Sequence, residues 1–215
     1  RAGPGAALAQ LLALRRHRYR LVVDLRTDGF ARLLGADRCL DKRGVRAEGG
    51  HAVQSHVSVL RPLIGAAPLP WPRLWVSAAE QAWADARLAN LAGARLLAIA
   101  PGANWPGKIW PAARYAATAD ALADRFDAVV LVGDGRDAAH AHAVAAAVRL
   151  PCLSLVGQST LLQAAAVLGR AEAFVGNDSG PGHMAAAMRR PTLTVFGPGR
   201  PLRYRPWGPA SDWVR

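Results

Sequence analysis

In the second half of the chain, short apolar runs alternate with segments that repeat apolar residues at helical spacing. The apolar runs predict strands over residues 96–100, 128–132, 152–156, 173–176 and 192–196. Helices are expected over residues 111–125, from the loop at 133–137 to about 148, over 161–168 and after Gly180. Strands that alternate with helices favour an α/β fold, with a parallel sheet covered by helices on both faces.

The first part of the chain is patterned less regularly. An amphipathic helix is expected over residues 1–18, with its leucines and arginines on different faces. A compact buried strand that ends in a carboxylate is predicted over residues 19–25, and a helix over residues 51–63, where valine and leucine recur at helical spacing. Glycines interrupt most of the sequence between these two elements, so no further element is predicted there.

A proline-rich stretch at residues 65–73 is the best linker in the sequence, because prolines favour an extended chain and exclude regular hydrogen bonding. We place a domain boundary near Pro70. Ser77 and Glu80 then have the spacing of a capping box, which predicts a helix that runs to about Leu91.

The composition is that of a globular protein, with 52% hydrophobic and 20% charged residues among 215. No apolar run approaches the roughly 20 residues that span a bilayer. The two cysteines, Cys39 and Cys152, are too few for a disulfide framework or a metal site and fit a reducing compartment. A net charge of +12 favours anionic partners, although scattered arginines also serve as ordinary surface residues.

The apolar strand that ends at Gly176 is followed by a tight turn that places several reactive side-chain types in succession. The turn consists of Asn177, Asp178, Ser179, Gly180, Pro181, Gly182 and His183. Gly180 and Gly182 are expected to let the backbone approach a ligand, and the first amides of the following helix favour an anion. The turn therefore predicts a phosphate site. The alternative is an ordinary strand-to-helix turn in which Asp178 or Ser179 caps the helix.

Two other loops follow strands at the same edge of the predicted sheet. The loop 101–111, P-G-A-N-W-P-G-K-I-W-P, contains Lys108, which is either a phosphate ligand or a solvated surface lysine. It is neither a P-loop nor a G-x-G-x-x-G motif. The loop 133–137 ends in Asp137, which either caps the next helix or binds ribose hydroxyls. Lysine, carboxylate and helix N-terminus together predict a nucleoside diphosphate ligand.

Two motifs of this chain are P-G-A-N-W-P-x-K-x-W-P and N-D-S-G-P-G-H-M-A-A-A-M-x-x-P-T-x-x-x-F-G-P. They resemble those of the ADP-heptose:lipopolysaccharide heptosyltransferases of glycosyltransferase family nine. The resemblance covers residues 96–198 and, more weakly, 19–25. It implies the GT-B architecture, in which two Rossmann-like domains face each other across a cleft. The domains would be the remainder of an N-terminal acceptor-side domain (1–69), a linker with a connecting helix (70–95) and a C-terminal nucleotide-sugar-binding domain (96–215).

The resemblance also implies roles for single residues. Lys108 would contact the donor phosphates, Asp137 would hold the ribose, and the backbone around Ser159 would contact the adenine. The diphosphate and sugar end of the site would be lined by Asp178, Ser179, Gly180 and His183. Asn104 and Ala103 stand where other members carry small hydroxyl residues; Asn104 can still hydrogen-bond there, whereas Ala103 cannot.

The family's proposed catalytic base, an aspartate after a glycine in the loop following the first strand of the N-terminal domain, has no counterpart in this chain. Asp24 and Asp28 match another part of the family pattern, so neither is assigned as the base, and the catalytic residue stays unknown. We therefore expect that the N-terminal part is missing. The ending at Trp213, Val214 and Arg215 also looks early, and the activity of this chain alone is left open.

The resemblance implies a cytoplasmic enzyme that transfers heptose from ADP-heptose to a lipopolysaccharide core acceptor. It would contact the anionic cytoplasmic face of the inner membrane peripherally and would need neither a metal nor another cofactor. Lys108 and the helix after Gly180 would stabilise the departing diphosphate. A nucleic-acid partner is not expected, since no basic and aromatic module is recognised. The alternatives are a GT-B transferase with another nucleotide sugar or a protein acceptor, and a non-catalytic nucleotide-sugar-binding fragment.

Overall fold

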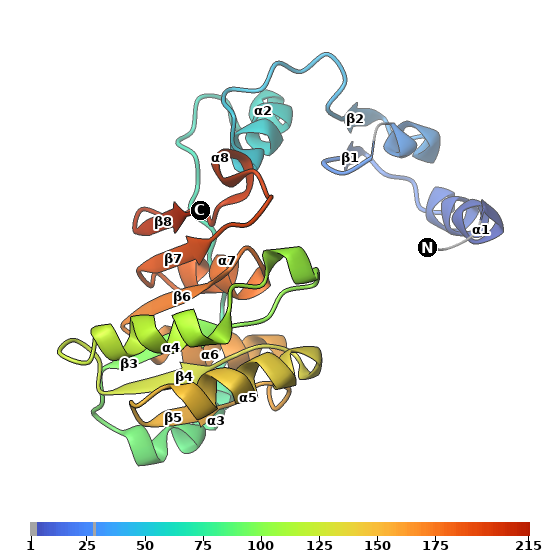
Figure 1. Cartoon of the computed structure of the whole chain (residues 1–215). Helices are drawn as coiled ribbons and strands as arrows, with labels where there is room; N and C mark the ends of the chain where they lie inside the picture. The colour runs from blue at the N-terminus through green and yellow to red at the C-terminus, as the bar shows by residue number, and fades with distance from the viewer. Residues whose placement is uncertain (1–3, 28) are drawn as a thin grey trace. The chain divides into compact units, whose positions relative to one another are not determined.

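The computed structural model describes residues 4–27 and 29–215. The chain divides into two compact units, Arg1–Pro70 and Trp71–Arg215 (Figure 1). Residues 67–77, around the division, form no regular structure, as their prolines require.

The second unit contains a parallel sheet of six strands in the order β5-β4-β3-β6-β7-β8. The strands are β3 (Leu96–Ala100), β4 (Ala128–Leu131), β5 (Cys152–Ser154), β6 (Ala173–Asn177), β7 (Thr192–Val195) and β8 (Ser211–Val214). The α/β class, the parallel sheet and the five expected strands are confirmed. Neither β8 nor the short helix α8 (Pro201–Tyr204) was predicted, because β8 is a short, half-exposed edge strand without an apolar run.

Helices cover both faces of this sheet, as expected (Figure 1). One face carries α3 (Ala78–Arg87), α6 (Leu161–Arg170) and α7 (Gly180–Ala187), and the other carries α4 (Ala112–Ala121) and α5 (Ala138–Ala147). Alternate residues of β3 supply the two cores: Ala98 packs with the first group of helices and Ile99 with the second, and both are fully buried. A strand buried on both faces must be apolar throughout, which explains its sequence.

A local sequence signal sets the start of α3. The predicted capping box of α3 is present: the Ser77 hydroxyl accepts from the amide of Glu80, and the Glu80 carboxylate accepts from the amide of Ser77 at 2.7 Å. The helix ends at Arg87 and is followed by a 3-10 turn at Ala89–Leu91, which together reach the predicted end. Helix α4 ends earlier than predicted, because the chain turns after Ala121 and buries Phe126.

The first unit contains α1 (Pro4–Arg15), β1 (Leu21–Val23), a 3-10 helix η1 (Phe30–Leu34), β2 (Arg38–Leu40) and α2 (Ala52–Ile64). The helix expected over residues 51–63 is confirmed, and β1 and β2 pair in parallel. The strand expected over 19–25 is present as β1, but it is shorter than predicted and none of its three residues is buried. The helix expected over 1–18 is present as α1, and its Leu8 and Leu12 are 57% and 54% exposed. Asp28 and residues 1–3 of the expected first helix lie outside the described residues.

Candidate functional site

The strand order of the second unit brings the predicted loops together. Strands β3 and β6 are neighbours, and the chain proceeds outward from them in opposite directions, first through β4 and β5 and later through β7 and β8. In open α/β sheets of this kind, ligands bind at the carboxyl ends of the strands where the direction reverses. The loop after β3 contains Lys108, and the turn after β6 begins at Asp178, so both lie at that point.

The side chains of Lys108 and Asp178 meet across this edge of the sheet. The Lys108 Nζ lies 2.6 Å from Asp178 Oδ2 and 3.4 Å from the Asp178 carbonyl oxygen. The side chains are 24% and 10% exposed, so Lys108 is neither fully solvated nor buried. The alternative of a solvated surface lysine therefore does not describe its surroundings. Phosphate binding by Lys108 stays a prediction.

Asn177, the last residue of β6, holds the loop 101–111 against the turn. Its side chain is fully buried, and its Nδ2 donates to the carbonyl oxygens of Pro101 at 2.8 Å and Gly102 at 3.3 Å. Its Oδ1 accepts from the amide of Trp110 at 2.9 Å and from the hydroxyl of Tyr115 at 2.8 Å. Burial raises the pKa of Tyr115, so this hydroxyl stays protonated and remains a donor. Sequence reasoning placed Asn177 in the turn but gave it no role.

The turn after β6 leads directly into α7. Ser179 is the N-cap residue, yet its side chain does not cap the helix; its hydroxyl donates to the carbonyl oxygen of Asn177 at 3.3 Å. A side chain at Gly180 would meet nothing within 4 Å, so the start of the helix is open on that side. The expectation for Gly182 is wrong: it is buried, and a Cβ there would lie 3.3 Å from Thr194 Oγ1. Gly182 therefore serves the packing of α7 on the sheet.

Asp137 lies next to the loop that carries Lys108. A Cβ on Gly102 would be only 1.9 Å from Asp137 Oδ1, so only glycine allows this approach. The other oxygen, Oδ2, accepts from the amide of Asp134 at 3.1 Å. The side chain makes no capping hydrogen bond to α5, which removes one of its two predicted roles. The ribose role stays a prediction.

The remaining predicted residues lie on the same set of loops. Ser159 is half-buried in the loop after β5, where the amide of Gly157 donates to the carbonyl oxygen of Gly133 at 3.1 Å. Asn104 is exposed in the loop after β3, and His183 is exposed in the first turn of α7. None of the three roles that the resemblance implies for these residues is tested by their positions.

A loop to which sequence reasoning gave no role in the site lies against Asp178. The segment after β7 contains Gly199, where a Cβ would lie 2.8 Å from Asp178 Oδ2. Arg215 holds this segment, because its Nη2 donates to the carbonyl oxygen of Gly199 at 2.5 Å and its Nε to that of Gly197 at 3.2 Å. The glycine-rich run G-P-G after an apolar strand was the signal that could have identified this loop.

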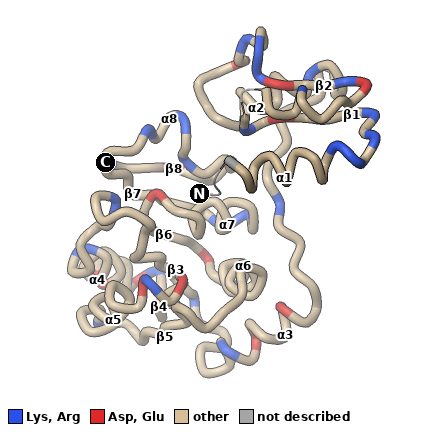
Figure 2. The backbone as a smooth tube through the Cα atoms, turned by 90° about the vertical axis from the view of Figure 1, so that its right-hand side faces the viewer, with Lys and Arg blue, Asp and Glu red and all other residues tan. Residues whose placement is uncertain are grey.

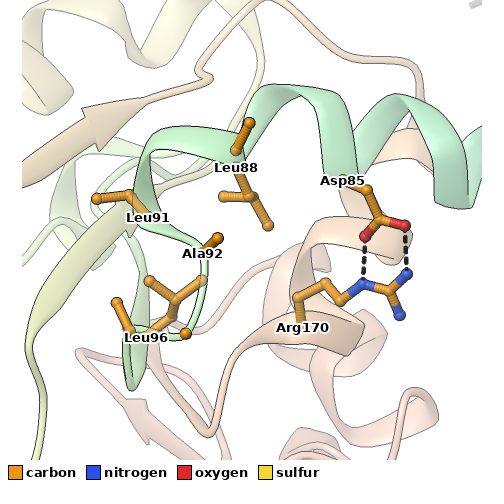
Figure 3. A pocket seen from close by; sticks show the side chains of 9 residues that line it. Asp85, Leu88, Leu91, Ala92, Leu96 and Arg170 are labelled. Carbon is orange, nitrogen blue, oxygen red and sulfur yellow. Dashed lines mark hydrogen bonds and ion pairs between the residues drawn. The ribbon is translucent and has the colours of Figure 1, made fainter.

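A pocket of about 270 Å³ lies away from these loops (Figure 3). It borders Leu96, the first residue of β3, and therefore lies at the amino ends of the strands. At its rim, Asp85 accepts two hydrogen bonds from Arg170, at 2.7 and 2.8 Å, and those bonds lower the pKa of the carboxyl. The pocket contains none of the predicted site residues.

Within residues 4–27 and 29–215, no three histidine, cysteine or acidic side chains gather as they would around a metal ion. Over the same residues, no helix has the length and apolar character that a membrane crossing requires.

A family model described as glycosyltransferase family 9 (heptosyltransferase) matches residues 27–215. The chain is 34% identical over 139 residues to lipopolysaccharide heptosyltransferase 2 of Escherichia coli K12. These residues cover 62% of the chain and 40% of that relative. It is 30% identical over 176 residues to an Escherichia coli lipopolysaccharide heptosyltransferase 3, covering 76% of the chain and 49% of the relative. The chain thus spans about half the length of these curated relatives or less.

Solved structures have the same fold. The structure of E. coli ADP-heptose lps heptosyltransferase II matches with a TM-score of 0.75 and 25% identity, over 98% of this chain and 72% of that one. A glycosyl transferase of family 9 from Veillonella parvula matches with a TM-score of 0.85 and 19% identity, over 100% of this chain and 69% of that one. At this level of identity, the match shows a shared fold alone. These matches agree with the expected GT-B architecture.

Proposed function

The chain belongs to glycosyltransferase family 9, and from this membership we propose that the protein transfers heptose from ADP-heptose to a lipopolysaccharide core acceptor. We assign donor binding to the unit Trp71–Arg215 and the acceptor side to Arg1–Pro70. The relatives that are named lipopolysaccharide heptosyltransferases support this class of reaction. Donor binding is the part of the proposal that this chain tests directly, because the chain covers less than half of those relatives.

The proposal rests on the ion pair between Lys108 and Asp178 at the carboxyl ends of β3 and β6, in which Nζ lies 2.6 Å from Oδ2. This position is the general ligand site of open α/β sheets. It adjoins the open start of α7, where amides without intrahelical partners favour a diphosphate. A cation, free amides and a nearby carboxylate suit an ADP-sugar better than a neutral ligand.

We assign the parts of the donor as follows. Lys108 and the first amides of α7 bind the diphosphate, with Ser179 and Asn104 as further hydrogen-bonding groups. Asp137 binds the ribose, which is supported by its position against Gly102 at the start of the loop that carries Lys108. The backbone around Ser159 binds the adenine. Asp178, Gly180 and His183 line the diphosphate and sugar end.

In the proposed reaction, the acceptor hydroxyl oxygen bonds to the anomeric carbon of heptose while the bond from that carbon to ADP breaks. The departing ADP gains negative charge, which Lys108 and the amides of α7 stabilise. A base removes the proton of the acceptor hydroxyl, and we assign no residue of this chain to that role. Asp24 is a poor candidate, because it accepts hydrogen bonds from the amides of Arg26 and Thr27 and from the Thr27 hydroxyl. We propose no metal or other cofactor.

We further propose that the protein acts at the cytoplasmic face of the inner membrane and contacts it peripherally. The net charge of +12 supports an anionic glycolipid acceptor in an anionic surface. Figure 2 shows Lys and Arg positions along both units. Binding to vesicles of anionic phospholipid, with neutral vesicles as the control, tests this part separately from donor binding.

Donor binding is tested by calorimetric titration of the chain with ADP, ADP-heptose, UDP and GDP. The chain has two lysines, Lys42 and Lys108, so ¹³C-methylation, which keeps the charge, gives each lysine its own NMR signal. We expect selective binding of ADP and ADP-heptose and a shift of the Lys108 signal, with that of the exposed Lys42 unchanged. Preference for another nucleotide would favour a different GT-B transferase. Absence of any nucleotide binding would overturn the proposal.

A further inference from the structure

Asn177 uses its complete hydrogen-bonding capacity inside the protein. An amide side chain has two donor hydrogens and an oxygen with two lone pairs. In Asn177 the donors go to the carbonyl oxygens of Pro101 and Gly102, and the oxygen accepts from the amide of Trp110 and the hydroxyl of Tyr115. The side chain is fully buried and therefore does not touch a ligand itself.

Three of these four bonds go to the loop that carries Lys108. Pro101 and Gly102 begin the loop and Trp110 lies near its end, so Asn177 ties both ends to β6. Between the tethers, the chain folds into the 3-10 turn that presents Lys108. Asp178, which accepts from Lys108, is the next residue after Asn177. One buried side chain thus fixes the loop beside the carboxylate that Lys108 contacts.

We infer that Asn177 is a positioning residue, which sets the place of Lys108 for the diphosphate; this inference rests on the proposed function. Asn177→Asp keeps the shape of the side chain and replaces the two donors with an oxygen. When protonated, the carboxyl has a single donor for the carbonyl oxygens of Pro101 and Gly102, and when ionised it has none, so the tether at the start of the loop is weakened in either form.

Tyr115→Phe provides a matched control. It removes one hydrogen bond to the same Oδ1 atom, but the lost donor comes from α4 and not from the loop. All three loop tethers of Asn177 remain. A general loss of stability around Asn177 should therefore occur in both variants, whereas a displaced Lys108 should occur only in Asn177→Asp.

The experiment is a double-mutant cycle on ADP affinity with Asn177→Asp and Lys108→Ala, at a temperature where melting curves show every variant folded. We expect Asn177→Asp to weaken ADP binding at least about tenfold and Tyr115→Phe less than about threefold. In the Lys108→Ala background, Asn177→Asp should add less than about threefold, because the residue acts through Lys108. Without ADP, Asn177→Asp should also shift the ¹³C-methyl signal of Lys108 but not that of Lys42.

Unchanged ADP affinity in Asn177→Asp, or the same loss with and without Lys108, would overturn the inference. If Asn177→Asp does not fold, Asn177→Ser, whose hydroxyl can replace one donor, takes its place with the same expectations. If both melt below the working temperature, Asn177 serves stability and the inference is rejected. Failure of the proposed function is seen separately, as a wild-type chain that does not bind ADP.

Discussion

The ion pair between Lys108 and Asp178 joins residues 70 positions apart and is the contact on which the candidate site depends. Asp178 is nearly buried, so it offers Lys108 a fixed partner rather than a solvated one. A diphosphate that bound Lys108 would share this cation with Asp178.

Lys108→Ala should weaken ADP binding by about 1.5–3 kcal/mol, the range for a charge-assisted hydrogen bond, which corresponds to a loss of affinity between roughly tenfold and 150-fold. Calorimetry on folded protein measures the effect. Lys42→Ala, at an exposed position of the other unit, is the control and should leave ADP affinity unchanged. Equal affinity of wild type and Lys108→Ala would remove Lys108 from the site.

Asp137→Ala should lower the affinity for ADP more than the affinity for free pyrophosphate, because pyrophosphate has no ribose. The expected loss for ADP is roughly tenfold, as for hydrogen bonds to a charged group. Asp134→Ala is the matched control: it disrupts the same 3-10 turn and an ion pair with Arg136, whereas the atoms nearest to a Cβ on Gly102 all belong to Asp137. Equal losses for ADP and pyrophosphate would contradict the ribose role.

The start of helix α7 supplies backbone groups, which a mutation cannot delete but can cover. A branched side chain at Gly180 could act in two ways: it could block the ligand, and it could strain the turn. The structure retains the first effect and removes the second, because Gly180 does not have a positive φ and a Cβ there meets no atom within 4 Å. A substitution at Gly180 can therefore block the ligand without destabilising the fold.

Gly180→Val should reduce ADP affinity more than Ser179→Ala does, while its melting temperature stays close to that of the wild type. Ser179→Ala removes one neutral hydrogen bond, worth about 0.5–1.5 kcal/mol, and leaves the backbone donors in place. Parallel titrations and melting curves of both variants check this. If Ser179→Ala has the larger effect on ADP, the backbone of α7 is not the main diphosphate site.

Acid should weaken the first unit partly through Asp24. Burial alone would raise the pKa of Asp24, but hydrogen bonds from the Thr27 hydroxyl and from the amides of Thr27, Arg26 and Ala31 lower it from 3.8 to about 2. A carboxyl with a lowered pKa stabilises the fold above its unfolded pKa, and this contribution is lost as the pH falls through the folded value.

The wild type should therefore lose stability relative to Asp24→Asn between about pH 4 and pH 2, and the difference should be constant at higher pH. Urea unfolding at a series of pH values, followed by a probe in the first unit, measures this difference. The other carboxylates titrate in both proteins, so their contributions cancel in the difference between the two unfolding free energies. A difference that does not change over this interval would show that Asp24 has an ordinary pKa when folded.

For the whole molecule, the local sequence was sufficient to predict the core of the second unit. Strands β3 and β6 are apolar runs that end in loops with distinctive residues, and the cap at Ser77 is formed by residues three positions apart. The first unit was predicted less well, because β1 and β2 are three-residue strands that exist only as a pair. Their pairing depends on residues about 17 positions apart, which no short window contains.

In the candidate site, the sequence predicted that Lys108 and the turn at Asp178 lie at the same edge of the sheet, because each belongs to a motif that can be read within a few residues. It did not identify the hydrogen bond from Asn177 to Pro101, 76 positions away, or the hydrogen bond from Arg215 to Gly199. These contacts arise from the order of the strands in the sheet, which brings distant loop ends to one edge. A hydrogen bond depends on where its partner lies in space, and that position follows from the packing of the entire sheet.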